Sequence, residues 1–168
     1  MPDFFTGYCS DGSPSDDTTS AVRFGLCDDP PSVPPRRAYL DTANPARWIA
    51  KVDNSAGYIV TFKGVDACLI ILRPDGTDEE RCDGMLLYGN TVLFVELKER
   101  TSAGWLGKAT GQLQLTVEAF RAAHGGLVGS QLKADVANSK RPLFQHGYQH
   151  SLNSFFRETN VVLRVEDT

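Results

Sequence analysis

The feature that most restricts the fold of this sequence is a pair of apolar runs, residues 83–88 and 91–98, separated by a Gly-Asn pair at 89–90. A two-residue loop of the type Gly-X between two such runs is a strong signal for a β-hairpin. In a hairpin this tight, Tyr88 pairs with Thr91, and that pair fixes the register of both strands. The rest of the chain must therefore fold around an antiparallel pair of strands.

The other periodic segments predict a chain of mixed type. Apolar residues within 104–124 recur at helical spacing, and a Gly-Gly pair stops that helix. A second helix is predicted over residues 45–52, with Asn44 as its N-cap and Pro45 at its first position. Strands are predicted over residues 58–62, 67–72, 131–137 and 160–165, a turn over 74–76, and a loop with a short helix over 143–156. This order indicates an α/β (α+β) fold with a central mixed β-sheet flanked by helices.

Residues 1–37 differ in composition from residues 38–168. They hold six of the nine prolines, and six aspartates against three arginines. Proline-rich and Asp-rich stretches cannot sustain a helix or a central strand, so an irregular N-terminal arm is predicted ahead of one folded domain. Asp28 and Asp29 could be metal ligands, but a solvated acidic loop is the favoured interpretation.

Length and composition exclude several classes of protein. A chain of 168 residues with 41% hydrophobic residues fits one domain with its own core. No apolar run has the length of a membrane span, and the start of the chain lacks the pattern of a secretory signal. Four cysteines, at positions 9, 27, 68 and 82, have no CxxC spacing, so reduced thiols and a cytoplasmic location are expected. The net charge of −4 argues against coating nucleic acid through bulk charge.

The second hairpin strand carries charges that an apolar strand should not contain. Glu96 and Lys98 are two residues apart, so they share one face of the strand. The register set by the turn places Asp83 opposite Glu96, with Cβ atoms about 5 Å apart. Two carboxylates that close repel each other, and a divalent cation is the usual compensation.

This arrangement predicts a magnesium site, with Mn²⁺ as a substitute ion. Asp83 and Glu96 would supply carboxylate oxygens, and the carbonyl of Leu97 is a third candidate ligand. A metal held there polarises a phosphoryl oxygen and lowers the pKa of a water. Lys98 can orient that water or stabilise the charge that develops on phosphorus. These groups suit hydrolysis of a phosphodiester.

An aspartate, twelve further residues and then Glu-Leu-Lys, on a hairpin followed by a helix, resemble the PD-(D/E)XK nuclease superfamily. That superfamily includes restriction endonucleases, Holliday-junction resolvases and exonucleases of recombination. The resemblance covers residues 67–123, about a third of the chain, and implies a restriction endonuclease-like αβββαβ core. It also implies a metal-dependent DNA nuclease in phage defence, recombination or repair. Cys82 stands where the family motif has proline.

In several branches of this superfamily a glutamine on the next helix faces the metal site. The resemblance assigns that role to Gln112 as first choice and to Gln114 as second. No tyrosine stands four residues after either glutamine, so the Gln/Tyr form of the motif is absent. Asp66 or Lys63, from the preceding strand, could add to the site, but structural or exposed roles are favoured for both.

Basic residues gather in the second half of the chain. Between residues 98 and 141 there are seven Lys/Arg against three acids. Four of them are candidates for phosphate contacts, namely Arg100, Lys108, Lys140 and Arg141. DNA is therefore the expected partner, with RNA left open, and the protein could act as a homodimer or as a subunit of a larger nuclease complex.

Several other interpretations remain open at this stage. Glu96 and Lys98 could be a surface ion pair on an edge strand, and Gln112 could be solvated. His146 and His150 have the spacing of a zinc pair on a helix but lack companion ligands. The chain could also be a catalytically inactive copy of the nuclease fold, or an acidic immunity or inhibitor protein. A nucleophile elbow and a phosphate-binding GxxxxGK loop are absent from the sequence.

Overall fold

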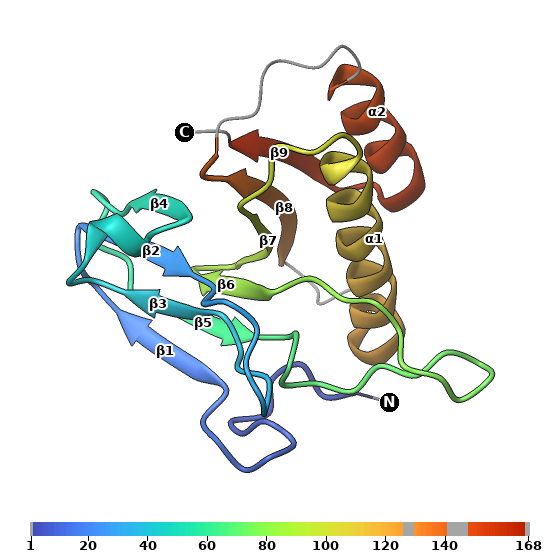
Figure 1. Ribbon diagram of the computed structural model, residues 1–168, viewed down its shortest axis with the longest axis horizontal. Coiled ribbons are helices and arrows are strands. Elements are labelled where there is room, and N and C mark those ends of the chain that lie inside the picture. Colours follow the sequence, from blue (N-terminus) through green and yellow to red (C-terminus); the bar gives the residue numbers. More distant parts are fainter. Residues whose placement is uncertain (1, 126–129, 141–147, 167–168) are drawn as a thin grey trace.

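Three layers of secondary structure build the fold, with a six-stranded sheet in the middle (Figure 1). The computed structural model describes residues 2–125, 130–140 and 148–166. Its elements are β1 (Asp16–Thr19), β2 (Arg23–Cys27), β3 (Tyr39–Asp41), a 3-10 helix η1 (Pro45–Arg47), β4 (Ala50–Asp53), β5 (Val60–Gly64), β6 (Gly84–Tyr88), β7 (Thr91–Lys98), α1 (Trp105–His124), β8 (Gln131–Asn138), α2 (Tyr148–Thr159) and β9 (Val162–Glu166). Helices α1 and α2 cover one face of the sheet, and a three-stranded sheet covers the other.

The central sheet is mixed, as predicted, and has the strand order β1-β5-β6-β7-β8-β9. The pairs β1–β5, β5–β6 and β6–β7 are antiparallel, whereas the pairs β7–β8 and β8–β9 are parallel. Helix α1 forms the long crossover that the parallel neighbours β7 and β8 require. The predicted hairpin is confirmed in its register, because Tyr88 pairs with Thr91. The strands predicted over 58–62, 131–137 and 160–165 are also present, as β5, β8 and β9.

Helix α1 packs on the sheet through the stripe that the sequence predicted. Its buried residues include Leu106, Ala109, Leu113, Val117 and Phe120. They share a core with residues of β6, β7, β8 and β9 and of α2. The helix ends at Gly125, which has a φ of 65°, in the left-handed region that favours glycine. Across the described residues, neither helix combines the length and the apolar character needed to cross a bilayer.

The helix predicted over residues 45–52 is wrong. Pro45–Arg47 form a short 3-10 turn, Trp48 is extended, and the chain then enters β4. Trp48 lies over Gly25 of β2, where an added Cβ would come within 1.9 Å of the indole ring. Its Nε1–H donates to Asp41 Oδ2 at 2.8 Å. Docking of this one side chain on β2 therefore outweighs a helical spacing that is only local.

The strand predicted over residues 67–72 is also wrong. These residues form a loop with one isolated bridge, between Leu72 and Asp78, around the predicted turn at 74–76. Ala67 has a φ of 61°, which an extended strand does not allow. Leu69 and Ile71 of this run pack in the α1 core, whereas Ile70 and Leu72 are exposed.

The N-terminal segment is not the irregular arm that its composition predicted. Phe4 is buried in the α1 core, 5.3 Å from Phe120 between ring centroids. Strand β1 pairs with β5 at the edge of the central sheet, and β2 is the middle strand of the small sheet. Phe24 and Leu26 of β2 fill the second core, between the two sheets. Tertiary packing of a few large apolar residues outweighs the Pro and Asp content of this segment.

The prediction of reduced thiols is wrong for two of the four cysteines. Cys9 and Cys68 form a disulfide, 59 residues apart in sequence. It joins the N-terminal loop to the loop after β5. Cys27 and Cys82 are free and buried. The fold brings the two half-cystines together over a distance that spacing rules do not cover.

Candidate active site

The hairpin places the two predicted carboxylates side by side. Asp83 comes immediately before β6, and the register of β6 and β7, continued by one residue, sets it opposite Glu96. The main-chain N–H of Asp83 donates to Glu96 Oε2 at 3.1 Å, and the N–H of Leu97 donates to Asp83 Oδ2 at 2.7 Å. Both residues belong to the sheet face that α1 covers, as do Met85 and Phe94 beside them. The predicted juxtaposition is therefore confirmed.

Burial makes this pair of carboxylates costly. Asp83 is 8% exposed and Glu96 is 2% exposed. Burial and then the neighbouring Glu96 raise the pKa of Asp83 well above its usual value. Burial raises the pKa of Glu96 to about 7, although Lys98 lowers it. The protein thus holds two acids where charge is poorly solvated, which is typical of functional sites.

Lys98 is buried with these acids and is held by two partners. Its Nζ lies 2.8 Å from Glu96 Oε1 and donates to Gln112 Oε1 at 2.9 Å. β7 lies between β6 and β8, and Lys98 is 9% exposed. The interpretation as a surface ion pair on an edge strand is therefore wrong. Glu96 and Gln112 therefore hold the ammonium group of Lys98 between them.

Helix α1 holds the segment that precedes Asp83 through two side chains one turn apart. Gln112 Nε2 donates to the carbonyl of Arg81 at 3.3 Å, and Thr116 Oγ1 accepts the N–H of Cys82 at 2.7 Å. Thr116 also donates to the Gln112 carbonyl at 2.8 Å. Gln112 therefore belongs to the site and is not a solvated helix residue. Gln114, the second choice, bonds instead to Glu118 on the exposed side of the helix.

The oxygen atoms at this end of the hairpin fit a hard divalent cation. In an antiparallel pair, the N–H and C=O of one residue point toward the same neighbouring strand. The Leu97 carbonyl is therefore directed to the side of Asp83, where the Leu97 N–H already bonds. Two carboxyl groups face one ammonium group here, so the site has an excess of buried negative charge once both acids are deprotonated. In the part of the chain that the structure describes, no three His, Cys, Asp or Glu side chains gather as metal ligands.

Two further acids border the site: Asp66, which the sequence offered as a possible addition, and Asp28, from a segment that sequence spacing does not connect to it. Asp28 is half-buried, and its pKa is raised to about 6 by burial and then by Asp66, Asp29 and Glu99, whereas Lys98 lowers it. Asp66 follows β5, forms an ion pair with Arg81 at 3.2 Å, and raises the pKa of Asp83. The interpretation of Asp28 as a solvated loop acid is therefore wrong.

Lys63 has a structural role, as favoured from the sequence. It is buried on β5 and forms an ion pair with Asp16 of β1 at 3.2 Å.

A shallow hollow of about 250 Å³ lies beside the site. It is lined by Asp66, Asp78, Glu79, Glu80, Arg81 and Gln112. The immediate surroundings of the hollow are thus acidic.

Three of the four predicted phosphate-binding residues lie on the surface around this end of the sheet. Lys98 and Asn138 are partners in the parallel β7–β8 register, so Arg100 and Lys140, two residues beyond each, leave the sheet at the same edge. Asn138 Nδ2 donates to the Arg100 carbonyl at 2.8 Å. Lys108 is exposed on α1, one turn before Gln112. Arg141 lies outside the described residues.

The zinc alternative gains no support. His150 is exposed on α2, and His146 lies outside the described residues.

Comparisons of the whole chain with protein-family models, with curated proteins and with solved structures gave no match. Any functional conclusion therefore depends on the residues of this chain.

Proposed function

We propose that this chain is a metal-dependent nuclease of the PD-(D/E)XK type that hydrolyses phosphodiester bonds in DNA. One observation carries the proposal: Asp83 and Glu96 are buried side by side while Lys98 is held between Glu96 and Gln112. A buried pair of acids with an ordered ammonium group has no evident structural purpose in a sheet. The succession β5-β6-β7-α1-β8 also supports it, because it matches the βββαβ part of the core that the resemblance implies.

The residues that would hold Mg²⁺, or Mn²⁺ in its place, are Asp83, Glu96 and the carbonyl of Leu97. When bound, the ion supplies Lewis-acid activation of a phosphoryl oxygen and of a water. Deprotonated carboxylates are required as ligands, so the raised pKa values of both acids make metal loading favourable at neutral to alkaline pH.

Lys98 acts on the substrate side of this site. An ammonium group has three N–H donors, and among the described residues Glu96 and Gln112 occupy two of them. The third donor is available for the attacking water or for an oxygen of the scissile phosphate. Charge that develops on that oxygen is stabilised by a donor that is already oriented. Gln112 is then a positioning residue, which acts by holding Lys98.

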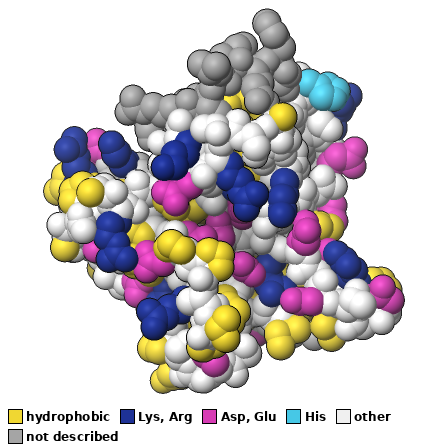
Figure 2. Space-filling view, viewed as in Figure 1, with side chains coloured by type: hydrophobic (Ala, Val, Ile, Leu, Met, Phe, Trp, Pro, Cys, Tyr) yellow, Lys and Arg dark blue, Asp and Glu magenta, His cyan; other side chains and the backbone are white. Residues whose placement is uncertain are grey.

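DNA would approach between the exposed ends of β7, β8 and α1. Arg100, Lys108 and Lys140 surround this region and would contact phosphates. Acidic and basic side chains are interspersed on the face shown in Figure 2, in keeping with the net charge of −4. Binding through a few local phosphate contacts, as a homodimer or as a subunit of a nuclease complex, fits this surface better than binding through bulk charge.

A second candidate is a catalytically inactive protein of the same fold that binds a partner, including an acidic inhibitor. The acidic hollow beside Gln112 favours it, because Asp66, Asp78 and neighbouring acids would repel a phosphate backbone. The intact set of Asp83, Glu96 and Lys98 favours the nuclease instead.

Cleavage of supercoiled plasmid DNA by the purified protein separates the two candidates. We expect nicking or linearisation with Mg²⁺ or Mn²⁺, none with EDTA, and loss of activity by about three orders of magnitude in Asp83→Asn and Glu96→Gln. Glu118→Gln, an exposed acid on α1, is the matched control and should cleave normally. A folded RNA substrate in parallel reactions tests the nucleic acid preference. Inactivity of the wild type with both ions, or full activity of Glu96→Gln, would reject the nuclease.

A further inference from the structure

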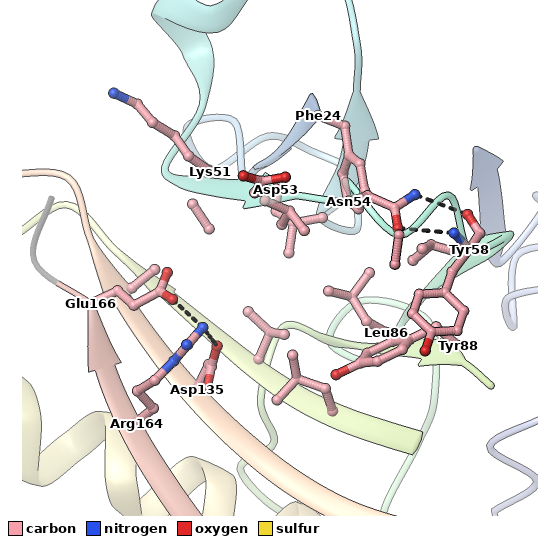
Figure 3. A pocket seen from close by; sticks show the side chains of 18 of the residues that line it. Phe24, Lys51, Asp53, Asn54, Tyr58, Leu86, Tyr88, Asp135, Arg164 and Glu166 are labelled. Carbon is pink, nitrogen blue, oxygen red and sulfur yellow. Dashed lines mark hydrogen bonds and ion pairs between the residues drawn. The ribbon is translucent and has the colours of Figure 1, made fainter. Parts of the chain in front are cut away.

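A cavity of about 470 Å³ lies between the two sheets, on the face of the central sheet away from α1 (Figure 3). Its floor includes Leu86, Leu93 and Val95, whose side chains point to the opposite face from Glu96 and Lys98. Phe24 and Val52 of the small sheet form part of its roof. A volume of this size is typical of cavities that bind small molecules. The nuclease proposal uses none of these residues.

Two tyrosines form one end of the cavity. The rings of Tyr58 and Tyr88 lie 5.7 Å apart between centroids and are tilted by 52°. Asn54 fixes the backbone of Tyr58, because its side-chain oxygen accepts the Tyr58 N–H at 3.1 Å and its amide donates to the Tyr58 carbonyl at 2.9 Å (Figure 3). This end therefore presents ordered aromatic surface to an apolar or aromatic group.

A cluster of charged residues from β8 and β9 forms the other end. Arg164 Nη2 contacts Asp135 Oδ2 at 3.2 Å and also Glu166. The side chains of Asp135 and Glu166 are 14% and 26% exposed, respectively. Burial raises the pKa of both carboxyl groups, and Arg164 lowers both. Lys133 also lowers the pKa of Asp135, whereas Glu166 shares Arg164 with Asp135. Glu166 is thus the carboxylate whose charge is left partly uncompensated.

β4, on the other side of the cavity, does not supply a positive charge that would compensate these carboxylates. Asp53 of β4 adds a third carboxylate to the lining. Lys51 is on the same strand, but Figure 3 shows its amino end directed away from Glu166 and Tyr88. The cavity is therefore apolar and aromatic along its length and acidic at one end.

We propose that this cavity binds a small aromatic amine, with its ring between the sheets beside Tyr58 and Tyr88 and its ammonium group against Asp135 and Glu166. The ring fills apolar volume that would otherwise be solvated. The ammonium group provides charge-assisted hydrogen bonds to carboxylates that share a single arginine. An anionic ligand of the same shape meets the same walls but is repelled at the acidic end.

Tryptamine and indole-3-propionate test this proposal, because they share a ring and carry opposite charges. We expect tryptamine to bind the full-length protein in calorimetry at least ten-fold more tightly than indole-3-propionate. Indole protons should show saturation transfer, and the shifted amide signals should come from residues of β4, β8 and β9. Absence of tryptamine binding, or equal binding of both probes, would overturn the proposal.

Two variants locate the site and distinguish it from binding elsewhere. Glu166→Gln removes one negative charge and should weaken tryptamine binding about ten-fold while leaving indole-3-propionate unchanged or tighter. Glu158→Gln, an exposed acid on α2, should not change either affinity. Tyr88→Leu keeps an apolar lining and should weaken both probes. Unchanged tryptamine affinity in a folded Glu166→Gln, judged by circular dichroism, would also overturn the proposal.

Discussion

At the scale of single residues, Lys98 connects the acids of the hairpin to α1, and its removal separates catalysis from metal binding. Lys98→Ala takes away a donor but leaves the oxygens of Asp83, Glu96 and Leu97 in place. We therefore expect DNA cleavage to be abolished while Mn²⁺ still binds. Because Lys98 lowers the pKa of Glu96, binding in the variant should require a higher pH than in the wild type. Calorimetry with Mn²⁺ across a pH series measures this shift.

The matched control for that experiment is Lys133→Ala, an exposed lysine on β8. It should bind Mn²⁺ and cleave DNA as the wild type does. Loss of Mn²⁺ binding by Lys98→Ala at every pH would mean that Lys98 shapes the metal site itself, which contradicts the role assigned to it.

The buried acids also give the metal-free protein a distinctive dependence of stability on pH. The pKa of Glu96 is about 7 in the folded protein against 4.5 in the unfolded chain, so the folded state binds more protons between these values. Stability is therefore greatest below that interval and falls as pH rises through it, by on the order of 3 kcal/mol. Asp83 contributes in the same direction, because its pKa is raised too.

We expect the metal-free protein to melt at a lower temperature above neutral pH than in mildly acidic buffer. Mg²⁺ should restore stability at the higher pH, because it binds the deprotonated carboxylates of the folded state. Thermal melts with and without Mg²⁺ measure both effects. Glu96→Gln should flatten the pH dependence, and an equally steep fall in that variant would show that other groups cause it.

At the scale of elements, three residues of α1 have different surroundings, and we expect a different effect from substituting each. Gln112→Ala should lower the cleavage rate with little change in DNA affinity, because Gln112 orients Lys98. Lys108→Ala should weaken DNA binding equally for all sequences and reduce the salt dependence by about one counterion. Leu113 is fully buried, so Leu113→Asp should unfold the protein. Cleavage rates, affinity in a salt series and circular dichroism provide the readouts.

The elements also show what a sequence can and cannot reveal. The hairpin was predictable with its register because a two-residue turn fixes the pairing, and Asp83 and Glu96 followed from it. Helix α1 was predictable because its stripe is long and periodic. The segment around Trp48 was not, since docking on Gly25 is a tertiary contact with no local pattern. Asp28 was interpreted as a solvated loop acid for the same reason: the fold brings it near Lys98 from a distant segment.

At the scale of the whole molecule, β7 is shared by two regions with different chemistry. On the face toward α1 its side chains include Glu96 and Lys98, and on the opposite face Leu93 and Val95 line the cavity between the sheets. The alternation of a strand makes both possible with one rigid element. The small sheet, which the sequence did not predict, closes one face of β7, and α1 closes the other.

A disulfide bond joins the N-terminal segment to the rest of the fold, and the last prediction concerns its effect on stability. The disulfide between Cys9 and Cys68 closes a loop with a sequence separation of 59. In the chain-entropy account, a loop of this length stabilises the folded state by about 4 kcal/mol, because the unfolded chain loses freedom. For a chain of this size that corresponds to a melting temperature roughly 10 °C higher in the oxidised protein. Disulfides persist in oxidising compartments, so this one counts against the reduced thiols from which a cytoplasmic location was expected.

Thermal melts with and without dithiothreitol test this tie directly. We expect the reductant to lower the melting temperature of the wild type and to have no effect on the double variant Cys9→Ser, Cys68→Ser, which should melt like the reduced protein. Thiol titration in denaturant without reductant should count the two free cysteines, Cys27 and Cys82. Four titratable thiols in freshly purified protein, together with melting temperatures that do not change with the reductant, would show that no covalent bond holds the N-terminal segment. Phe4 in the α1 core would then anchor the loop ahead of β1, and Phe4→Ala would be the more destabilising change, by about 3 kcal/mol or more.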